Sequence, residues 1–163
     1  MKKEEPEKFL RQEREKEEMF NSIKKEALKR PSMQSIISSS DWHGKTPDGK
    51  NDFIKGEMCW SGSMSAALLV PEGTAILSIQ AKGSPADGIY PYMIVELDGE
   101  VIGETFVNNM DWKEYEFRIN TSGTVPDGTL KVLSVTFWND AVNAQKNEDR
   151  NLYIGEARII KNE

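Results

Sequence analysis

The chain has 163 residues, of which 37% are hydrophobic and 29% are charged. This length and composition predict one globular domain of ordinary size, and no stretch approaches the roughly 20 apolar residues of a membrane-spanning helix. No apolar signal region follows Met1, and Cys59 is the only cysteine, which excludes an intramolecular disulfide.

Charge is unevenly distributed along the chain. Residues 1–30 hold ten Lys or Arg against eight Asp or Glu, a net of +2, and the remainder holds 11 against 19, a net of −8. An acidic main domain repels a phosphate backbone, so we do not expect nucleic acid as a partner. A neutral sugar, a metal ion or a basic protein suits this charge better.

Residues 1–30 predict a charged helix. Glu26 and Arg30 form one of several acid-before-base pairs four residues apart, which stabilise helices, and Pro31 ends the segment. A short apolar stripe has helical spacing: Met19, Phe20, Ile23, Ala27 and Leu28. Two interpretations remain open, a solvated spacer helix or a helix that packs on a partner or on its own domain through this stripe.

From residue 57 onward the hydrophobic period changes to two. Apolar and polar residues alternate in five runs, over residues 75–81, 93–97, 115–119, 133–137 and 153–159. Asp98-Gly99 is a hairpin signal, because both residues tolerate positive φ. About eight strands with no helix between them predict an all-β antiparallel sandwich, a jelly roll. We therefore divide the chain into a helical leader or linker (1–31), a connector rich in Ser, Gly, Asp and Pro (32–56), and a sandwich domain (57–163).

Catalytic motifs are incomplete in this sequence. His43 is the only histidine and lies in the predicted connector, where nothing would fix the geometry of a catalytic triad. Residues 44–50 match most of a phosphate-binding loop, but Asn51 stands where that motif requires Ser or Thr. No two carboxylates stand out as a glycosidase pair. The sequence therefore predicts a domain that is not an enzyme.

A long polar loop, residues 139–151, separates the last two predicted strands. Its oxygen donors are Asn139, Asp140, Asn143, Gln145, Asn147, Glu148, Asp149 and Asn151. Calcium prefers such a set of oxygen ligands. The alternative is a solvated loop whose Asp and Asn side chains only satisfy backbone turns.

The order F-x-N-D, a polar loop and then D-R-N-L-Y-I resembles the last two strands of the calcium-dependent xylan-binding modules and of related carbohydrate-binding domains in bacterial polysaccharide proteins. Residues 91–103 are similar to the family's P-x-x-x-V-x-x-D-G-x-x-x-G hairpin. Residues 79–83 are similar to its I-x-A-x-G strand and residues 112–117 to its W-x-x-Y-x-F. The resemblance covers roughly residues 57–161.

The resemblance implies a jelly roll whose loops bind sugar, with a calcium ion that coordinates sugar hydroxyls. By position it puts four side chains near the ion, with Arg150 beside them as a ligand-binding residue: Asn139, Asp140, Asp149 and Asn151. Family members often carry Asp after L-Y-V, where Gly155 stands here. If that Asp is a metal ligand in the family, either Glu156 takes its place here or calcium binds weakly or not at all.

We expect a non-catalytic, calcium-assisted carbohydrate-binding module of a larger polysaccharide-handling protein, and the resemblance implies an extracytoplasmic or periplasmic location. The candidate rings for stacking on a polysaccharide or oligosaccharide are Tyr90, Tyr92, Trp112 and Trp138. Core packing is the alternative for these rings, and is favoured for Trp138 because it ends a strand. A sandwich that binds a protein partner through residues 1–31 and one sheet face is the alternative function, and a glycan-active enzyme is the third.

Overall fold

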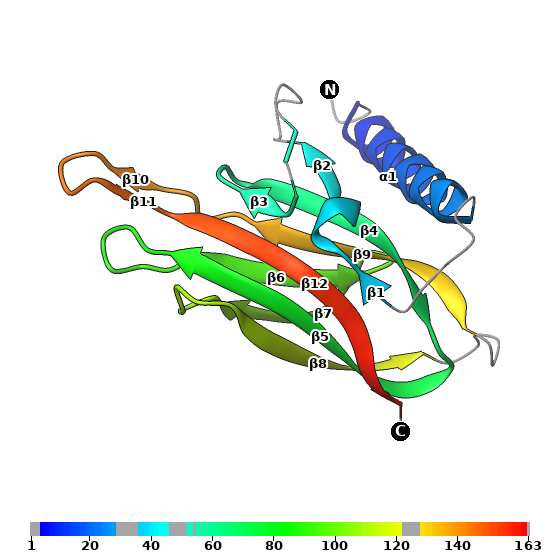
Figure 1. Cartoon of the computed structure of the whole chain (residues 1–163). Coiled ribbons are helices and arrows are strands. Elements are labelled where there is room, and N and C mark those ends of the chain that lie inside the picture. Colours follow the sequence, from blue (N-terminus) through cyan, green and yellow to red (C-terminus); the bar gives the residue numbers. More distant parts are fainter. Residues whose placement is uncertain (1–3, 29–35, 46–51, 54, 122–127, 163) are drawn as a thin grey trace. The chain divides into compact units, whose positions relative to one another are not determined.

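The computed structural model describes residues 4–28, 36–45, 52–53, 55–121 and 128–162. The chain forms two compact units, Met1–Met33 and Gln34–Glu163 (Figure 1). The first unit contains helix α1 (Glu4–Leu28), which confirms the predicted helix over the described part of the leader. None of the described helices is long and apolar enough to cross a membrane.

The second unit is an antiparallel sandwich of two sheets, which confirms the predicted fold class (Figure 1). The strands of the first sheet are β1 (Ile36–Ile37), β12 (Asn151–Asn162), β5 (Gly73–Ser84) and β8 (Lys113–Thr121), with β3 (Glu57–Met58) paired to β12. Those of the second sheet are, in order, β2 (His43–Lys45), β4 (Gly62–Val70), β9 (Thr129–Phe137), β6 (Tyr92–Leu97) and β7 (Glu100–Phe106).

In the alternating runs of the sequence, every second side chain points into the core between the two sheets. Leu77 and Ile79 of β5, Met93 and Val95 of β6, and Phe137 of β9 are fully buried. Burial of such side chains contributes about 1.5–3 kcal/mol each. The hairpin between β6 and β7 turns at Asp98 and Gly99, whose φ values of 48° and 85° confirm the predicted hairpin turn.

Part of the predicted connector belongs to the sheets. Strand β1 pairs with β12, and strand β2 pairs with β4, so that His43 lies opposite Ser65 on an edge strand. Ile37 and Trp42 are buried, and the Trp42 Nε1 donates a 2.9 Å hydrogen bond to the Gly155 carbonyl. Strands of two and three residues show no measurable alternation, which is why the sequence did not reveal them. Most of the connector's predicted turn, residues 46–50, lies outside the described residues.

Candidate functional site

The polar loop 139–151 folds in part into a small hairpin. Strand β10 (Val142–Asn143) pairs with β11 (Glu148–Asp149), and Val142 lies opposite Asp149. The hairpin extends beyond the end of the sheets, next to the turn that leads from β5 to β6 (Figure 1). Because β10 pairs with β11, the two ends of the loop come together. The strands that flank the loop, β9 and β12, were expected to pair with each other, but they belong to different sheets.

Three of the predicted metal ligands converge where the hairpin meets the sheets. We call Asp140, Asp149 and Asn151 the oxygen cluster. The Asn151 Nδ2 donates a 3.3 Å hydrogen bond to the Asp149 Oδ2. Burial raises the pKa of the Asp140 carboxyl, and the negative charge of Asp149 raises it further, while the Ala141 amide and the Arg150 guanidinium lower it. The two carboxylates therefore lie within electrostatic reach of each other.

Two oxygen atoms of the cluster lack any hydrogen-bond partner. The Asp140 Oδ1 and the Asn151 Oδ1 are both buried and unpaired. Buried polar oxygens are almost always bonded, so each unpaired one needs an explanation. A bound cation with both oxygens as ligands would explain why they are unpaired. Carboxylate and amide oxygens are the ligands that calcium prefers. The donor set therefore fits a calcium ion.

The cluster has fewer acidic groups than a calcium site in which the protein supplies every ligand. Among the described residues no three His, Cys, Asp or Glu side chains gather around one point. Calcium takes about six to eight oxygens, so backbone carbonyls, water or ligand hydroxyls must complete the shell. Such an incomplete shell leaves room for a sugar.

The segment that leads from β3 to β4 forms the opposite side of the cluster, and the sequence analysis missed it. The Asp140 amide donates a 3.2 Å hydrogen bond to the Ser61 Oγ. Burial raises the pKa of the Cys59 thiol, and the charges of Glu57, Asp149 and Asp140 raise it further. Trp60, between these two residues, is 49% exposed. Only the packing of distant strands brings this segment to the loop, so no local signal could have identified it.

Ser84, at the end of β5, connects both strands of the cluster. Its Oγ donates a 2.6 Å hydrogen bond to the Asp149 carbonyl and accepts a 3.1 Å bond from the Asn151 amide. These bonds fix the backbone on either side of Arg150, so the side chains of Asp149 and Asn151 have a defined orientation.

Two predicted ligands have structural hydrogen bonds in this fold. We call Asn139 and Arg150 the clamp. The Asn139 Oδ1 accepts a 2.8 Å bond from the Tyr92 amide, and its Nδ2 donates to the Tyr90 carbonyl at 3.1 Å. Arg150 is 6% exposed, and its guanidinium donates to the carbonyls of Ile89, Asn139 and Ala86 at 2.7, 2.5 and 2.7 Å. These bonds connect both side chains to the turn between β5 and β6, so the clamp holds the base of the hairpin.

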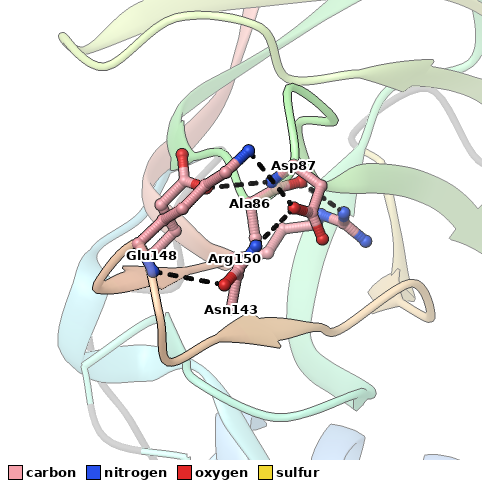
Figure 2. Close-up of polar contacts among 6 residues, drawn as sticks. Ala86, Asp87, Asn143, Glu148 and Arg150 are labelled. Atoms are coloured by element: carbon pink, nitrogen blue, oxygen red, sulfur yellow. Dashed lines mark hydrogen bonds and ion pairs between the residues drawn. The ribbon is translucent and has the colours of Figure 1, made fainter.

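A second set of contacts attaches the hairpin to the turn between β5 and β6. We call Asp87, Asn143 and Glu148 the latch. The Asn143 Nδ2 donates a 2.6 Å bond to the Asp87 Oδ1, and the Asp87 amide donates to the Glu148 Oε1 at 3.3 Å. Figure 2 shows this latch together with Arg150, whose bond to the Ala86 carbonyl holds the same turn. The hairpin is therefore held by the latch at its strands and by the clamp at its base.

Glu156 and Trp112 lie on the outer face of the first sheet. Glu156 is five residues beyond Asn151 on β12, past a register shift, and its carboxylate lies 3.6 Å from the Arg158 Nε. Trp112 is nearer to the cluster, because the hydroxyl of its neighbour Tyr153 accepts a 3.4 Å hydrogen bond from the Asn151 Nδ2. The ring of Trp112 contacts the Lys82 ammonium at 4.7 Å, and Lys82 also lies over Tyr153. The structure pairs Glu156 with Arg158, and its role as a metal ligand stays a prediction.

The other predicted aromatic residues lie at the same end of the sandwich as the cluster. Trp138 directly precedes the clamp and is 60% exposed, so the preference for core packing was wrong. Tyr92 and Tyr90 are half-buried, and the backbone of each is bonded to Asn139. Tyr92 packs edge-on against Trp138, with ring centroids 6.1 Å apart.

A family model of calcium-dependent, xylan-binding carbohydrate-binding modules, CBM60, matches residues 76–163. The chain belongs to this family. The match contains β6 to β12 and thus the whole oxygen cluster, and it confirms the predicted family of calcium-dependent carbohydrate-binding modules. No curated protein sequence matches the module.

Solved structures agree on the fold. The module is similar to the CBM36-1 domain of a multidomain xylanase from the hindgut metagenome of Trinervitermes trinervoides, with 12% identity, a TM-score of 0.55 and coverage of 78% of this chain and 97% of that one. It is also similar to a carbohydrate-binding module CBM36 in complex with calcium and xylotriose, with 7% identity, a TM-score of 0.53 and coverage of 77% and 98%. At these identities the two structures show a shared sandwich fold.

Proposed function

We propose that the module binds a xylan-type polysaccharide through a calcium ion held by the oxygen cluster, and that it does not cleave the polymer. The observation that supports this most directly is the pair of buried, unpaired oxygens on Asp140 and Asn151 beside a second carboxylate. Membership of a calcium-dependent, xylan-binding family supplies the ligand class.

In this proposal Asp140, Asp149 and Asn151 hold the ion. Bound calcium would attract further oxygen donors, including neighbouring hydroxyls of a sugar ring. Exposed rings beside the cluster, those of Trp60 and Trp138, offer apolar surface for the opposite side of the sugar. The clamp and the latch keep the hairpin in place, so that ordering the loop does not reduce the affinity.

The organisation of the chain is part of the proposal. The leader, residues 1–31, acts as a separable helical linker or partner helix, and the sandwich is a targeting module of a larger polysaccharide-handling protein on the extracytoplasmic side of a cell. Family membership supports a non-catalytic role.

Calorimetry with xylohexaose tests the proposal, with millimolar calcium in one titration and excess chelator in the other. We expect binding only with calcium, and no release of reducing sugar after long incubation with xylan. Binding that survives chelation would remove the ion from the mechanism. Hydrolysis that a single Asp or Glu substitution abolishes would show an enzyme instead.

A further inference from the structure

Three aromatic side chains form a row across the outer face of the second sheet. We call Phe106, Tyr92 and Trp138 the aromatic row. Tyr92 of β6 lies opposite Phe106 of β7. On its other side β6 pairs with β9, where Met93 lies opposite Phe137, so Tyr92 and Trp138 are neighbours. Because Met93 and Phe137 are fully buried, the adjacent residues point away from the core.

The row is exposed although its rings touch one another. Phe106 is 49% exposed and Trp138 is 60% exposed. Tyr92 stands between them, with ring centroids 4.7 Å from Phe106 and 6.1 Å from Trp138 and interplanar angles of 72° and 71°. Its hydroxyl donates a 2.7 Å hydrogen bond to the Glu104 Oε1, which restricts the orientation of the ring. Contiguous exposed apolar surface of this kind marks a binding site rather than ordinary surface.

Three of the four neighbouring positions on the same face are polar, the exception being Ile94. One step along the strands lie Glu104, Ile94 and Thr136, which are mutually paired. Next to them the Ser63 Oγ and the Thr136 Oγ1 are 2.6 Å apart. Aromatic faces beside hydroxyl and carboxylate groups suit the apolar face and the hydroxyls of a sugar. Since these four residues include a carboxylate and no cation, a neutral sugar chain fits better than an acidic one.

The row is continuous with the oxygen cluster. Trp138 is two residues before Asp140, and Asn139 between them bonds the Tyr92 amide and the Tyr90 carbonyl. The row extends over three strands, roughly 10 Å, which is longer than a single sugar ring. A chain with one sugar at the ion can therefore continue over the rings.

We propose that the aromatic row is a second set of subsites, which makes no contact with the ion and adds affinity to a neutral xylan chain that continues from the oxygen cluster across β9, β6 and β7. The inference rests on the proposed function and adds that the module binds the interior of a long chain. Phe106, which the sequence analysis did not identify, holds the far end of that chain.

Calorimetry with xylobiose and xylohexaose, in millimolar calcium, tests this inference on the full chain. We expect the normal protein to bind xylohexaose more tightly than xylobiose. Phe106→Ala should lower the affinity for xylohexaose roughly three- to tenfold and leave xylobiose and calcium binding unchanged. Phe106→Tyr should retain most of the affinity. The matched control is Val101→Ala, on the same face of the same strand and 52% exposed, which should change neither affinity.

Several results would overturn the inference. Affinity that does not depend on chain length, or an equal loss for both sugars in Phe106→Ala, would reject the row as separate subsites and leave the calcium site standing. A dimer of the normal protein that Phe106→Ala dissociates, seen by sedimentation, would show that the row contacts a second copy of the chain. No binding of either sugar by the normal protein would reject the proposed function and this inference with it.

Discussion

The clamp and the oxygen cluster lie side by side at the end of the sandwich, but their hydrogen bonding differs. Both polar ends of the Asn139 side chain and three positions on the Arg150 guanidinium are bonded to backbone groups. In the cluster, Asp140 and Asn151 each keep a buried oxygen without a partner. The two sets alternate along the sequence, since Asn139 precedes Asp140 and Arg150 separates Asp149 from Asn151.

This difference distinguishes a structural set from a ligand-binding set. Satisfied buried groups stabilise the folded chain, whereas unsatisfied ones reduce its stability until something else binds them. Removal of a clamp residue should therefore weaken the fold, and removal of a cluster residue should weaken only binding. Four predictions test that separation, from the largest expected effect to the smallest.

Arg150→Ala should have the largest effect on stability. It leaves the carbonyls of Ala86, Ile89 and Asn139 without their donor in a buried place. We expect a loss of about 3–5 kcal/mol in the free energy of unfolding, measured in urea. Arg158→Ala is the control, because Arg158 forms only exposed ion pairs with Glu114 and Glu156, and it should change stability by less than about 1 kcal/mol. A loss no larger than the control's would show that the clamp is not structural.

Asp140→Asn and Asp149→Asn should abolish calcium-dependent binding and leave the fold intact. Calcium at a hundred times its dissociation constant should stabilise the normal protein by about 2.7 kcal/mol, and neither variant should show this gain. Without calcium both should be at least as stable as the normal protein, because the repulsion between two carboxylates is removed. Thermal melting with calcium or chelator measures this, with Glu116→Gln on the outer face of β8 as control. A calcium-induced shift that persists in either variant would place the ion elsewhere.

Asp87→Ala should have a smaller effect, because it opens the latch and leaves the clamp in place. The Asn143 amide loses its 2.6 Å acceptor and the exposed ion pair with Lys146, 3.9 Å long, is lost. We expect stability to fall by about 1 kcal/mol or less and calcium affinity to fall roughly two- to fivefold, because the hairpin is held less firmly. Calorimetry gives the affinity. A complete loss of calcium binding would mean that Asp87 itself contacts the ion.

Deletion of residues 1–31 should have the smallest effect. Their charged sequence gives the sandwich little apolar surface, so the melting temperature should shift by only a few degrees. A longer deletion, of residues 1–42, is the contrasting variant. It removes Ile37 and Trp42, both buried in the sandwich, and should unfold it. Unfolding of the shorter deletion would show instead that the stripe of Met19 to Leu28 belongs to the core.

The sequence predicted the sandwich because long alternating strands and glycine turns are local signals. The runs over residues 75–81 and 133–137 lie within β5 and β9, and the pair Asp98-Gly99 forms the expected turn. Strands β1 and β2 were missed because two or three residues carry no period. These two short strands are strands only because they pair with β12 and β4.

The candidate site was predicted in part. The sequence by itself determined the family and the polar loop. It did not determine how the two ends of the loop meet, because the flanking strands β9 and β12 belong to different sheets and the short strands β10 and β11 pair instead. Only the tertiary structure decided which oxygens are free. It bonds Asn139 and Arg150 to the backbone of the turn between β5 and β6, carries Glu156 along β12 to Arg158, and brings Ser61 and Trp60 to the cluster from a distant segment. Hydrogen-bond partners far apart in the chain leave no local trace in its sequence, and it is those partners that separate a ligand from a structural residue.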